Sequence, residues 1–134
     1  MLAPPVDAPT LAQPRNDDSL VLFLRYGAIS MLLEGDAEKP VERSIALQFH
    51  EHADVLKVGH HGSATSTTQQ LLDAVRPQYA VIAPGYRKTF GFPRRDVLER
   101  LEAAQVRTYR TDAQGAISSY LDGKSVIAQA ACCP

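Results

Sequence analysis

Two adjacent histidines, His60 and His61, are the residues of this chain whose types and spacing point most directly to chemistry. They follow a short, largely apolar run at residues 55–58, which predicts a buried strand that Gly59 ends. In open α/β sheets, ligands and metals bind at the carboxyl ends of strands, because the loops there do not pack in the core while the sheet fixes the positions at which they begin and end. The sequence therefore predicts a site in the loop that carries the two imidazoles.

An acidic loop, Gly-Asp-Ala-Glu at residues 35–38, follows a second predicted strand at residues 28–33. Imidazole nitrogens and a carboxylate oxygen suit zinc or manganese, so Asp36, His60 and His61 are the candidate metal ligands and catalytic residues if their loops converge. The alternative is structural. Acidic side chains also stabilise helix N-termini, and a loop histidine often serves only as a hydrogen-bonding residue.

Hydroxyl and basic side chains near these loops are candidates for contact with a phosphate-bearing substrate. The substrate-binding candidates are Lys57, Ser63, Thr65, Ser66 and Arg94. The hydroxyl cluster also has the composition of a turn and a helix cap, which remains the alternative for it. A basic cluster that adds Arg87, Lys88 and Arg95 could contact DNA, or it could be a solvated rim.

Alternating strand and helix patterns are expected to position these loops. The chain reads in order as a strand hairpin at 20–24 and 28–33, a helix at 39–49, a strand at 53–58, a helix starting at Thr67, a strand at 79–83, a helix starting near Pro93, a strand at 106–110, a turn at 112–115 and a hairpin at 116–121 and 124–128. This order predicts an α/β fold with a parallel centre and helices packed on the sheet.

Length and composition indicate one globular domain. The chain has 134 residues, 45% of them hydrophobic, and a net charge of -1, so any contact with nucleic acid must use a local patch. We expect a flexible proline-rich arm at 1–18, the domain at 19–129 and a tail at 130–134 with Cys132 and Cys133 reduced. No apolar run approaches the roughly 20 residues of a membrane span and no signal peptide is evident, so we expect a cytoplasmic location.

Several motifs in fixed order together resemble one known family. The motifs are Asn-Asp-Asp-Ser-Leu-Val-Leu at 16–22, Leu-Glu-Gly-Asp-Ala-Glu at 33–38, Ala-Asp-Val-Leu-Lys-Val-Gly-His-His-Gly-Ser at 53–63, Arg-Pro at 76–77 and Arg-Thr-Asp at 110–112. They closely resemble the C-terminal half of the metallo-β-lactamase-like domain of the competence-related ComEC family. The resemblance extends from Asn16 to about Ser118.

The resemblance implies half of an αββα sandwich, with a mixed sheet and helices on one of its faces. It also implies a metal-dependent hydrolase that cleaves DNA during DNA uptake, with Asp36 as the acidic ligand that bridges two zinc or manganese ions and His60 and His61 as the tandem histidine motif. Such a metal pair would polarise a phosphodiester and lower the pKa of an attacking water. In the family this domain is attached to a membrane channel.

Two departures from the family pattern shape our expectations. The superfamily's histidine- and aspartate-rich signature lies in an N-terminal half that is not in this chain, and Phe92 stands where the family has a histidine ligand. We therefore expect weak or absent metal binding and no activity from the chain alone, unless a complementary chain supplies the missing half. The alternative is a non-catalytic, homodimeric binding module. Because half a sandwich exposes an apolar sheet face, we expect a second copy, a complementary chain or the N-terminal arm to cover it.

Overall fold

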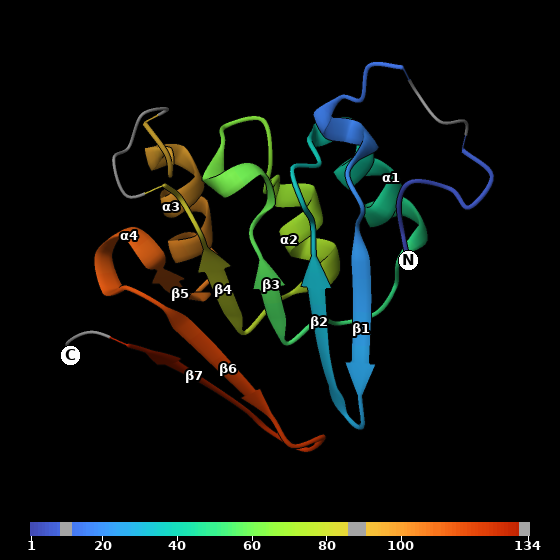
Figure 1. Ribbon diagram of the computed structural model, residues 1–134. Helices are drawn as coiled ribbons and strands as arrows, with labels where there is room; N and C mark the ends of the chain where they lie inside the picture. The colour runs from blue at the N-terminus through green and yellow to red at the C-terminus, as the bar shows by residue number, and fades with distance from the viewer. Residues whose placement is uncertain (9–11, 86–90, 132–134) are drawn as a thin grey trace.

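A mixed β-sheet forms the centre of the part of the chain that the structure describes, which is residues 1–8, 12–85 and 91–131 of a computed structural model (Figure 1). Its strands lie side by side in chain order: β1 (Leu22–Tyr26), β2 (Ile29–Leu33), β3 (Val55–Lys57), β4 (Tyr79–Ile82) and β5 (Arg107–Arg110). β1 pairs antiparallel with β2, and the later neighbours pair in parallel. The predicted α/β fold is confirmed. The loops after β2, β3 and β4 consequently leave the sheet at one edge.

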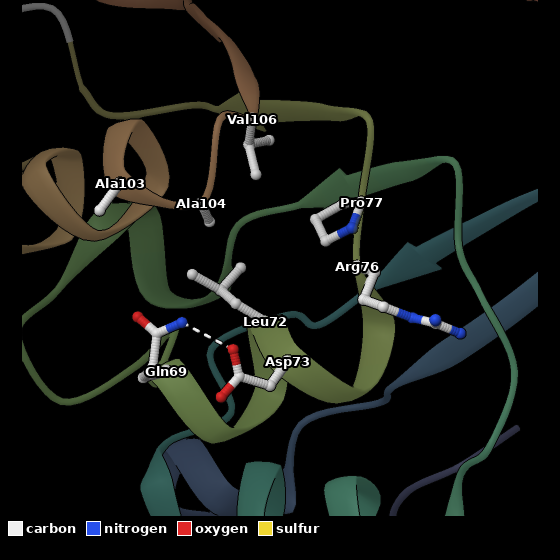
Figure 2. A pocket seen from close by; sticks show the side chains of 8 residues that line it. All are labelled: Gln69, Leu72, Asp73, Arg76, Pro77, Ala103, Ala104 and Val106. Atoms are coloured by element: carbon white, nitrogen blue, oxygen red, sulfur yellow. Dashed lines mark hydrogen bonds between the residues drawn. The ribbon is translucent and has the colours of Figure 1, made fainter.

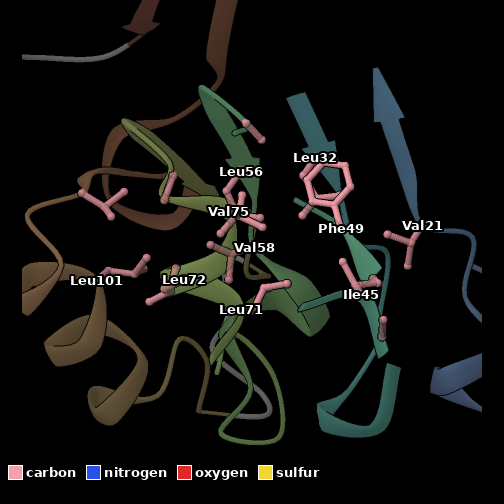
Figure 3. Close-up of a cluster of buried hydrophobic side chains, with 14 of the residues drawn as sticks. Val21, Leu32, Ile45, Phe49, Leu56, Val58, Leu71, Leu72, Val75 and Leu101 are labelled. Atoms are coloured by element: carbon pink, nitrogen blue, oxygen red, sulfur yellow. The ribbon is translucent and has the colours of Figure 1, made fainter. Parts of the chain in front are cut away.

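The helices α1 (Lys39–Gln48), α2 (Gln69–Val75) and α3 (Arg95–Ala103) cover one face of this sheet (Figure 1). Each helix connects two parallel neighbours, and such crossovers are right-handed, so all of them fall on the same side. The core between the two layers is apolar (Figure 3). Its largest fully buried aliphatic side chains include Leu32, Leu56 and Ile82 from the sheet and Leu71 and Leu101 from the helices. Burial of each contributes about 1.5–3 kcal/mol, which holds the site's loops on a rigid base.

A hairpin of β6 (Ile117–Leu121) and β7 (Val126–Ala130) follows the short helix α4 (Thr111–Gln114). In Figure 1 it runs past the lower end of the sheet, from the side of β5 toward the β1–β2 turn. The Ala28 N–H donates to the Gly123 carbonyl at 2.7 Å, and the Tyr109 hydroxyl donates to the Ala128 carbonyl at 3.2 Å. These two hydrogen bonds hold the turn of the hairpin and its strand β7 against the main sheet.

Several element boundaries differ from the sequence prediction, each for a local reason. α2 is capped by Thr68, whose Oγ1 accepts the Leu71 N–H, because Thr67 has φ +53° and cannot take the extended conformation of a cap. The last hairpin turns through residues 122–125, because the Asp122 carboxylate accepts the N–H groups of both Lys124 and Ser125. Residues 112–114 belong to α4 and not to a plain turn.

The first residues of the predicted arm contact the helix side of the fold. Ala3 is 8% exposed and forms a bridge with Val21, and Met1 and Leu2 line a hollow beside Ile45 and other residues of α1. A second segment of the arm, the 3-10 turn η1 (Asn16–Asp18), reaches the acidic loop, since Asp17 accepts the Glu38 N–H at 2.8 Å. Met1, Leu2 and Ala3 therefore lie beside Val21 and α1, and coverage of the opposite sheet face by the arm stays a prediction.

Apolar side chains are exposed on the sheet face away from the helices. Phe23 points to the helix side, where its ring packs edge-on against Phe49, and successive residues of a strand alternate between faces. Leu24 and Tyr26 therefore lie on the other face, and they are 48% and 62% exposed. No helix in the described ranges is long and apolar enough to cross a membrane.

Candidate functional site

Asp36 and His61 meet at the edge of the sheet where β2 and β3 end. Asp36 Oδ1 and His61 Nε2 are 3.5 Å apart, and both side chains are a little under half exposed. The other ring nitrogen, Nδ1, lies 2.7 Å from the Ala83 carbonyl oxygen in the loop after β4. A carbonyl only accepts, so Nδ1 carries a proton, and in the neutral imidazole the lone pair of Nε2 then faces the carboxylate. This tautomer leaves Nε2 able to bind a metal.

The separation of these two atoms suits shared coordination better than a direct hydrogen bond. Hydrogen bonds from nitrogen to oxygen are usually 2.7–3.2 Å long, shorter than the 3.5 Å observed. Two ligands placed about 2.0–2.1 Å from one zinc ion in a tetrahedron are roughly 3.3–3.4 Å apart. Asp36 and His61 therefore fit two positions around a divalent metal ion. A zinc site takes three or four protein ligands.

His60, the third expected ligand, is turned toward a different carboxylate. Its Nδ1 lies 3.2 Å from Glu38 Oε1, and its ring packs edge-on against Phe92 with 5.6 Å between ring centroids. Phe92, which we expected in the place of a histidine ligand, contacts the imidazole through its ring and supplies no donor atom. Among the residues that the structure describes, no group of three or more histidine, cysteine, aspartate or glutamate side chains could hold a metal ion. The structure brings Asp36 and His61 together and leaves His60 beside them.

The histidine loop, η2 (Gly59–Gly62), has an unusual backbone. His60 and His61 have φ of 43° and 55°, in the left-handed region that residues other than glycine rarely adopt. Each such residue costs on the order of 1–3 kcal/mol, and such strain concentrates at functional sites. The His60 N–H donates to the Gly35 carbonyl at 3.0 Å, which ties this loop directly to the acidic loop.

The predicted hydroxyl residues mainly shape the loop. Ser66 is fully buried, and its Oγ donates to the Gly59 and Ser63 carbonyls at 2.9 and 3.2 Å. Ser63 is 6% exposed and shares a 2.9 Å hydrogen bond with Thr65, which is exposed and donates to Glu38 at 2.8 Å. The alternative of turn and cap chemistry therefore describes Ser63 and Ser66 better than contact with a substrate.

Two of the predicted cations lie near the loops. Lys57 is largely buried, and this burial lowers its pKa below the ordinary value even though the nearby carboxylates of Glu34 and Asp36 act to raise it. Its Nζ donates to the Val58 carbonyl at 2.8 Å. Arg94 is exposed at the start of α3, and its N–H donates to the Gly62 carbonyl at 2.8 Å. With Arg95 it lines a hollow of about 730 Å³ beside the histidine loop. Arg87 and Lys88 lie outside the described residues.

Three glutamates that we did not predict as site residues support these loops. The Gly59 N–H donates to Glu34 Oε2 at 2.9 Å, and burial raises the pKa of Glu34 well above its ordinary value. Glu42, also buried, accepts the N–H groups of Thr67 and Thr68. Hydrogen bonds from Thr65 and from Asn16 lower the pKa of Glu38, so that its carboxyl group is ionised at neutral pH. Glu34 and Glu38 both lie in the Leu-Glu-Gly-Asp-Ala-Glu motif at 33–38, and this was the available signal for them, whereas Glu42 lies outside the quoted motifs.

A further hollow, of about 400 Å³, lies between α2 and the connection from α3 to β5 (Figure 2). Its lining includes Leu72, Pro77 and Val106, together with Gln69, whose side chain donates to Asp73 at 2.8 Å. None of the predicted site residues lines this hollow. This hollow is therefore separate from the candidate site at Asp36 and His61.

No family model matches the chain. It is, however, 39% identical over 104 residues to ComE operon protein 3 of Bacillus subtilis and 40% identical over 102 residues to Recombination protein 2 of Haemophilus influenzae. It is 35% identical over 116 residues to Competence protein ComA of Neisseria gonorrhoeae. Over this segment the chain is related to the competence proteins. The resemblance to a competence family is confirmed, while the metallo-β-lactamase-like domain stays a prediction.

These matches cover most of this chain but little of each relative. The aligned residues make up 77%, 76% and 85% of the chain, in the order given above. They make up only 13%, 13% and 17% of the corresponding relatives. The chain thus spans only a small part of each of these relatives.

Proposed function

We propose that this chain is a segment of a competence-related, metal-dependent DNA hydrolase and supplies two ligands of its metal site. The observation that carries the proposal is the pair Asp36 Oδ1 and His61 Nε2, 3.5 Å apart, with the His61 tautomer held by the Ala83 carbonyl. The similarity to competence proteins supports DNA as the substrate, because competence is the uptake of DNA. The segment would form half of an αββα sandwich.

The chain's own residues have distinct parts in this proposal. Asp36 and His61 hold the divalent ion, zinc or manganese, and the backbone of η2 keeps the imidazole in place. When bound, the ion would polarise the phosphodiester and lower the pKa of an attacking water. Lys57 and the exposed Arg94 would offset the negative charge of the DNA phosphate near the acidic and histidine loops. Lys57 lies close to the carboxylates of Glu34 and Asp36.

Two ligands do not complete such a site, so the proposal requires further ligands from polypeptide outside the described residues. The test mixes this chain with the portion of the Bacillus relative that lies outside the aligned segment, and follows cleavage of a fluorescent DNA oligonucleotide with Mn²⁺. We expect no cleavage by the chain alone and cleavage by the mixture that Asp36→Asn abolishes. Cleavage that survives both Asp36→Asn and His61→Ala would contradict the proposal.

A second candidate, a homodimeric binding module without catalysis, is favoured by the exposed Leu24 and Tyr26 on the open sheet face. In this candidate the module binds single-stranded DNA through Arg94 and Arg95 at the start of α3. Affinity for an oligonucleotide should then fall with salt concentration and drop at least tenfold in Arg94→Ala/Arg95→Ala. Unchanged affinity in the double variant would remove this candidate.

A further inference from the structure

β1 is the outermost strand of the main sheet, and most of its outer edge has no partner strand among the described residues. The strand order is β1-β2-β3-β4-β5, so β1 pairs with β2 on one side only. On its other side, within the described part of the chain, a single bridge joins Ala3 to Val21, just before β1 begins. An edge strand presents N–H and C=O groups that can pair with a further strand. The outer edge of β1 is therefore a candidate interaction surface.

The hydrogen bonds at Val21 show which backbone groups point away from β2. The Val21 N–H donates to the Ala3 carbonyl at 2.8 Å, and the Ala3 N–H donates to the Val21 carbonyl at 3.5 Å. Backbone groups alternate in direction along a strand, so those of Phe23 and Arg25 also point away from β2. Those of Leu24 point toward β2. An added strand would thus find two N–H and two C=O groups of β1 on this edge.

The bridge also sets the direction and the register of an added strand. It is antiparallel, so each step from Ala3 toward the N-terminus is matched by a step along β1 away from Val21. Continued in this register, Met1 falls opposite Phe23, and a residue before Met1 in a longer polypeptide would fall opposite Leu24. In Figure 1 the N-terminus lies beside the start of β1, on the side away from β2. The first residues thus begin a strand that β1 is long enough to continue.

The outer edge lacks the features that usually keep edge strands from pairing. Proteins protect such edges with lysine, proline or a bulge. β1 has the sequence Leu-Phe-Leu-Arg-Tyr, without lysine or proline, and its register with β2 is unbroken. Exposure rises along the chain, from Val21, which is fully buried beside Ala3, to 48% at Leu24 and 62% at Tyr26. The exposed part of β1 is the part that lies beyond the pair with Ala3.

We propose that the outer edge of β1 binds an extended strand, antiparallel to β1, from the remaining polypeptide of a longer competence protein. The aligned residues are only 13%, 13% and 17% of the three competence relatives, so such proteins have ample polypeptide to supply the strand. It continues the pairing that Ala3 begins and adds backbone hydrogen bonds to Phe23 and Arg25. A cation opposite Arg25 is disfavoured, because like charges directly opposite each other destabilise a sheet. The inference does not depend on the proposed metal site.

Amide hydrogen exchange measured by NMR tests the edge first in the chain itself. The Leu24 amide faces β2 and should exchange slowly, whereas the Arg25 amide should exchange about tenfold faster or more. Slow exchange of Arg25 at every protein concentration would show that the edge is not free. Protection of Arg25 that grows with concentration would show a second copy on this edge. Either result would overturn the proposal.

The second stage extends the chain at its N-terminus with the residues that come directly before the counterpart of Met1 in the Bacillus relative, enough for a strand of about six residues. We expect the Arg25 amide to exchange about tenfold more slowly than in the unextended chain, while Leu24 is unchanged. The control carries the same extension with proline at the position opposite Arg25. Its missing N–H faces β1 in this register, so Arg25 should exchange as in the unextended chain.

The Leu24 amide shows in every sample whether β1 and β2 are still paired. If Leu24 stays protected and the extension leaves Arg25 exchange unchanged, the proposal is overturned. Equal protection of Arg25 by the original extension and by the proline-containing extension would also overturn it, because the added residues would then not be paired with β1 as a strand. These measurements involve neither metal nor DNA, so their outcome is distinct from that of the proposed function.

Discussion

Gly59 precedes the tandem histidines at a point where a side chain would be crowded. A Cβ atom there would lie 3.2 Å from the Ala37 carbonyl oxygen, 3.2 Å from Glu34 Oε2 and 3.3 Å from Ser66 Cβ. The neighbours are a backbone carbonyl and buried side chains, so they cannot easily move apart. At the residue scale, close packing of glycine is thus what brings the acidic and histidine loops together.

Gly59→Ala should lower the free energy of unfolding by about 1–3 kcal/mol, the usual cost of overpacking a tight interior. Urea denaturation followed by circular dichroism measures the change. Gly85→Ala is the matched control, because a Cβ at Gly85 would meet no atom within 4 Å. Equal stability of the two variants would show that the loops do not pack as described.

Glu42 is a second residue whose removal has a defined cost. Its carboxylate accepts the N–H groups of Thr67 and Thr68, and Glu42→Ala would leave these donors without that acceptor. We expect a loss of about 1–3 kcal/mol of unfolding free energy, measured by thermal and urea denaturation. Glu99→Ala removes an exposed partner of Arg95 and should cost at most about 1 kcal/mol. A Glu42 variant as stable as the Glu99 variant would contradict this role.

At the scale of elements, Asp54 links β2 to β3 at the edge opposite the site. Its Oδ2 accepts the N–H of Ser30 at 2.7 Å and the Ser30 hydroxyl at 3.1 Å, and its Oδ1 lies 3.1 Å from His52 Nε2. Partial burial raises the pKa of Asp54, but the hydrogen bonds from Ser30 and His52 together outweigh burial. The pKa is therefore below its ordinary value of 3.8.

This lowered pKa predicts a pH dependence of stability. Below the ordinary pKa the unfolded chain binds a proton that the folded chain does not, so the stabilisation is complete above about pH 4 and is lost as the pH falls through the folded pKa. Asp54→Asn should remove this component. Urea denaturation between pH 2.5 and 7 should show a smaller acid-induced loss in the variant, and identical pH profiles would contradict the assignment.

The sequence predicted the elements well because apolar periodicity and the glycine and proline positions are local signals. It also indicated the meeting of Asp36 and His61, because each follows one of two adjacent parallel strands, β2 and β3. It did not indicate the turn of His60 toward Glu38, since the left-handed backbone of both histidines depends on contacts between distant loops. The hydrogen bond from His61 to the Ala83 carbonyl could not be predicted either, because every residue has a backbone carbonyl and the sequence does not show which one accepts.

At the scale of the whole molecule, Leu24 and Tyr26 are exposed on the sheet face away from the helices. If Leu24 and Tyr26 form a dimer interface, Leu24→Ser/Tyr26→Ser should convert a dimer into a monomer in sedimentation velocity, because burial of these exposed apolar side chains drives association. Leu47→Ser, at an exposed position on α1, is the control and should remain dimeric. A monomeric wild-type chain at all concentrations would exclude the homodimer.

The proposed function requires above all that Asp36 and His61 bind one divalent metal ion together. Equilibrium dialysis against Zn²⁺ of the chain mixed with the complementary portion of the Bacillus relative tests it most directly, with Asp36→Asn, His61→Ala and, as a control at an exposed position after α1, His50→Ala in the chain. We predict that each of the first two variants weakens Zn²⁺ binding at least tenfold and that the control binds like the wild type. Equal Zn²⁺ binding by the four mixtures, or no binding by the wild-type mixture beyond that of the complementary portion alone, would contradict shared binding by Asp36 and His61.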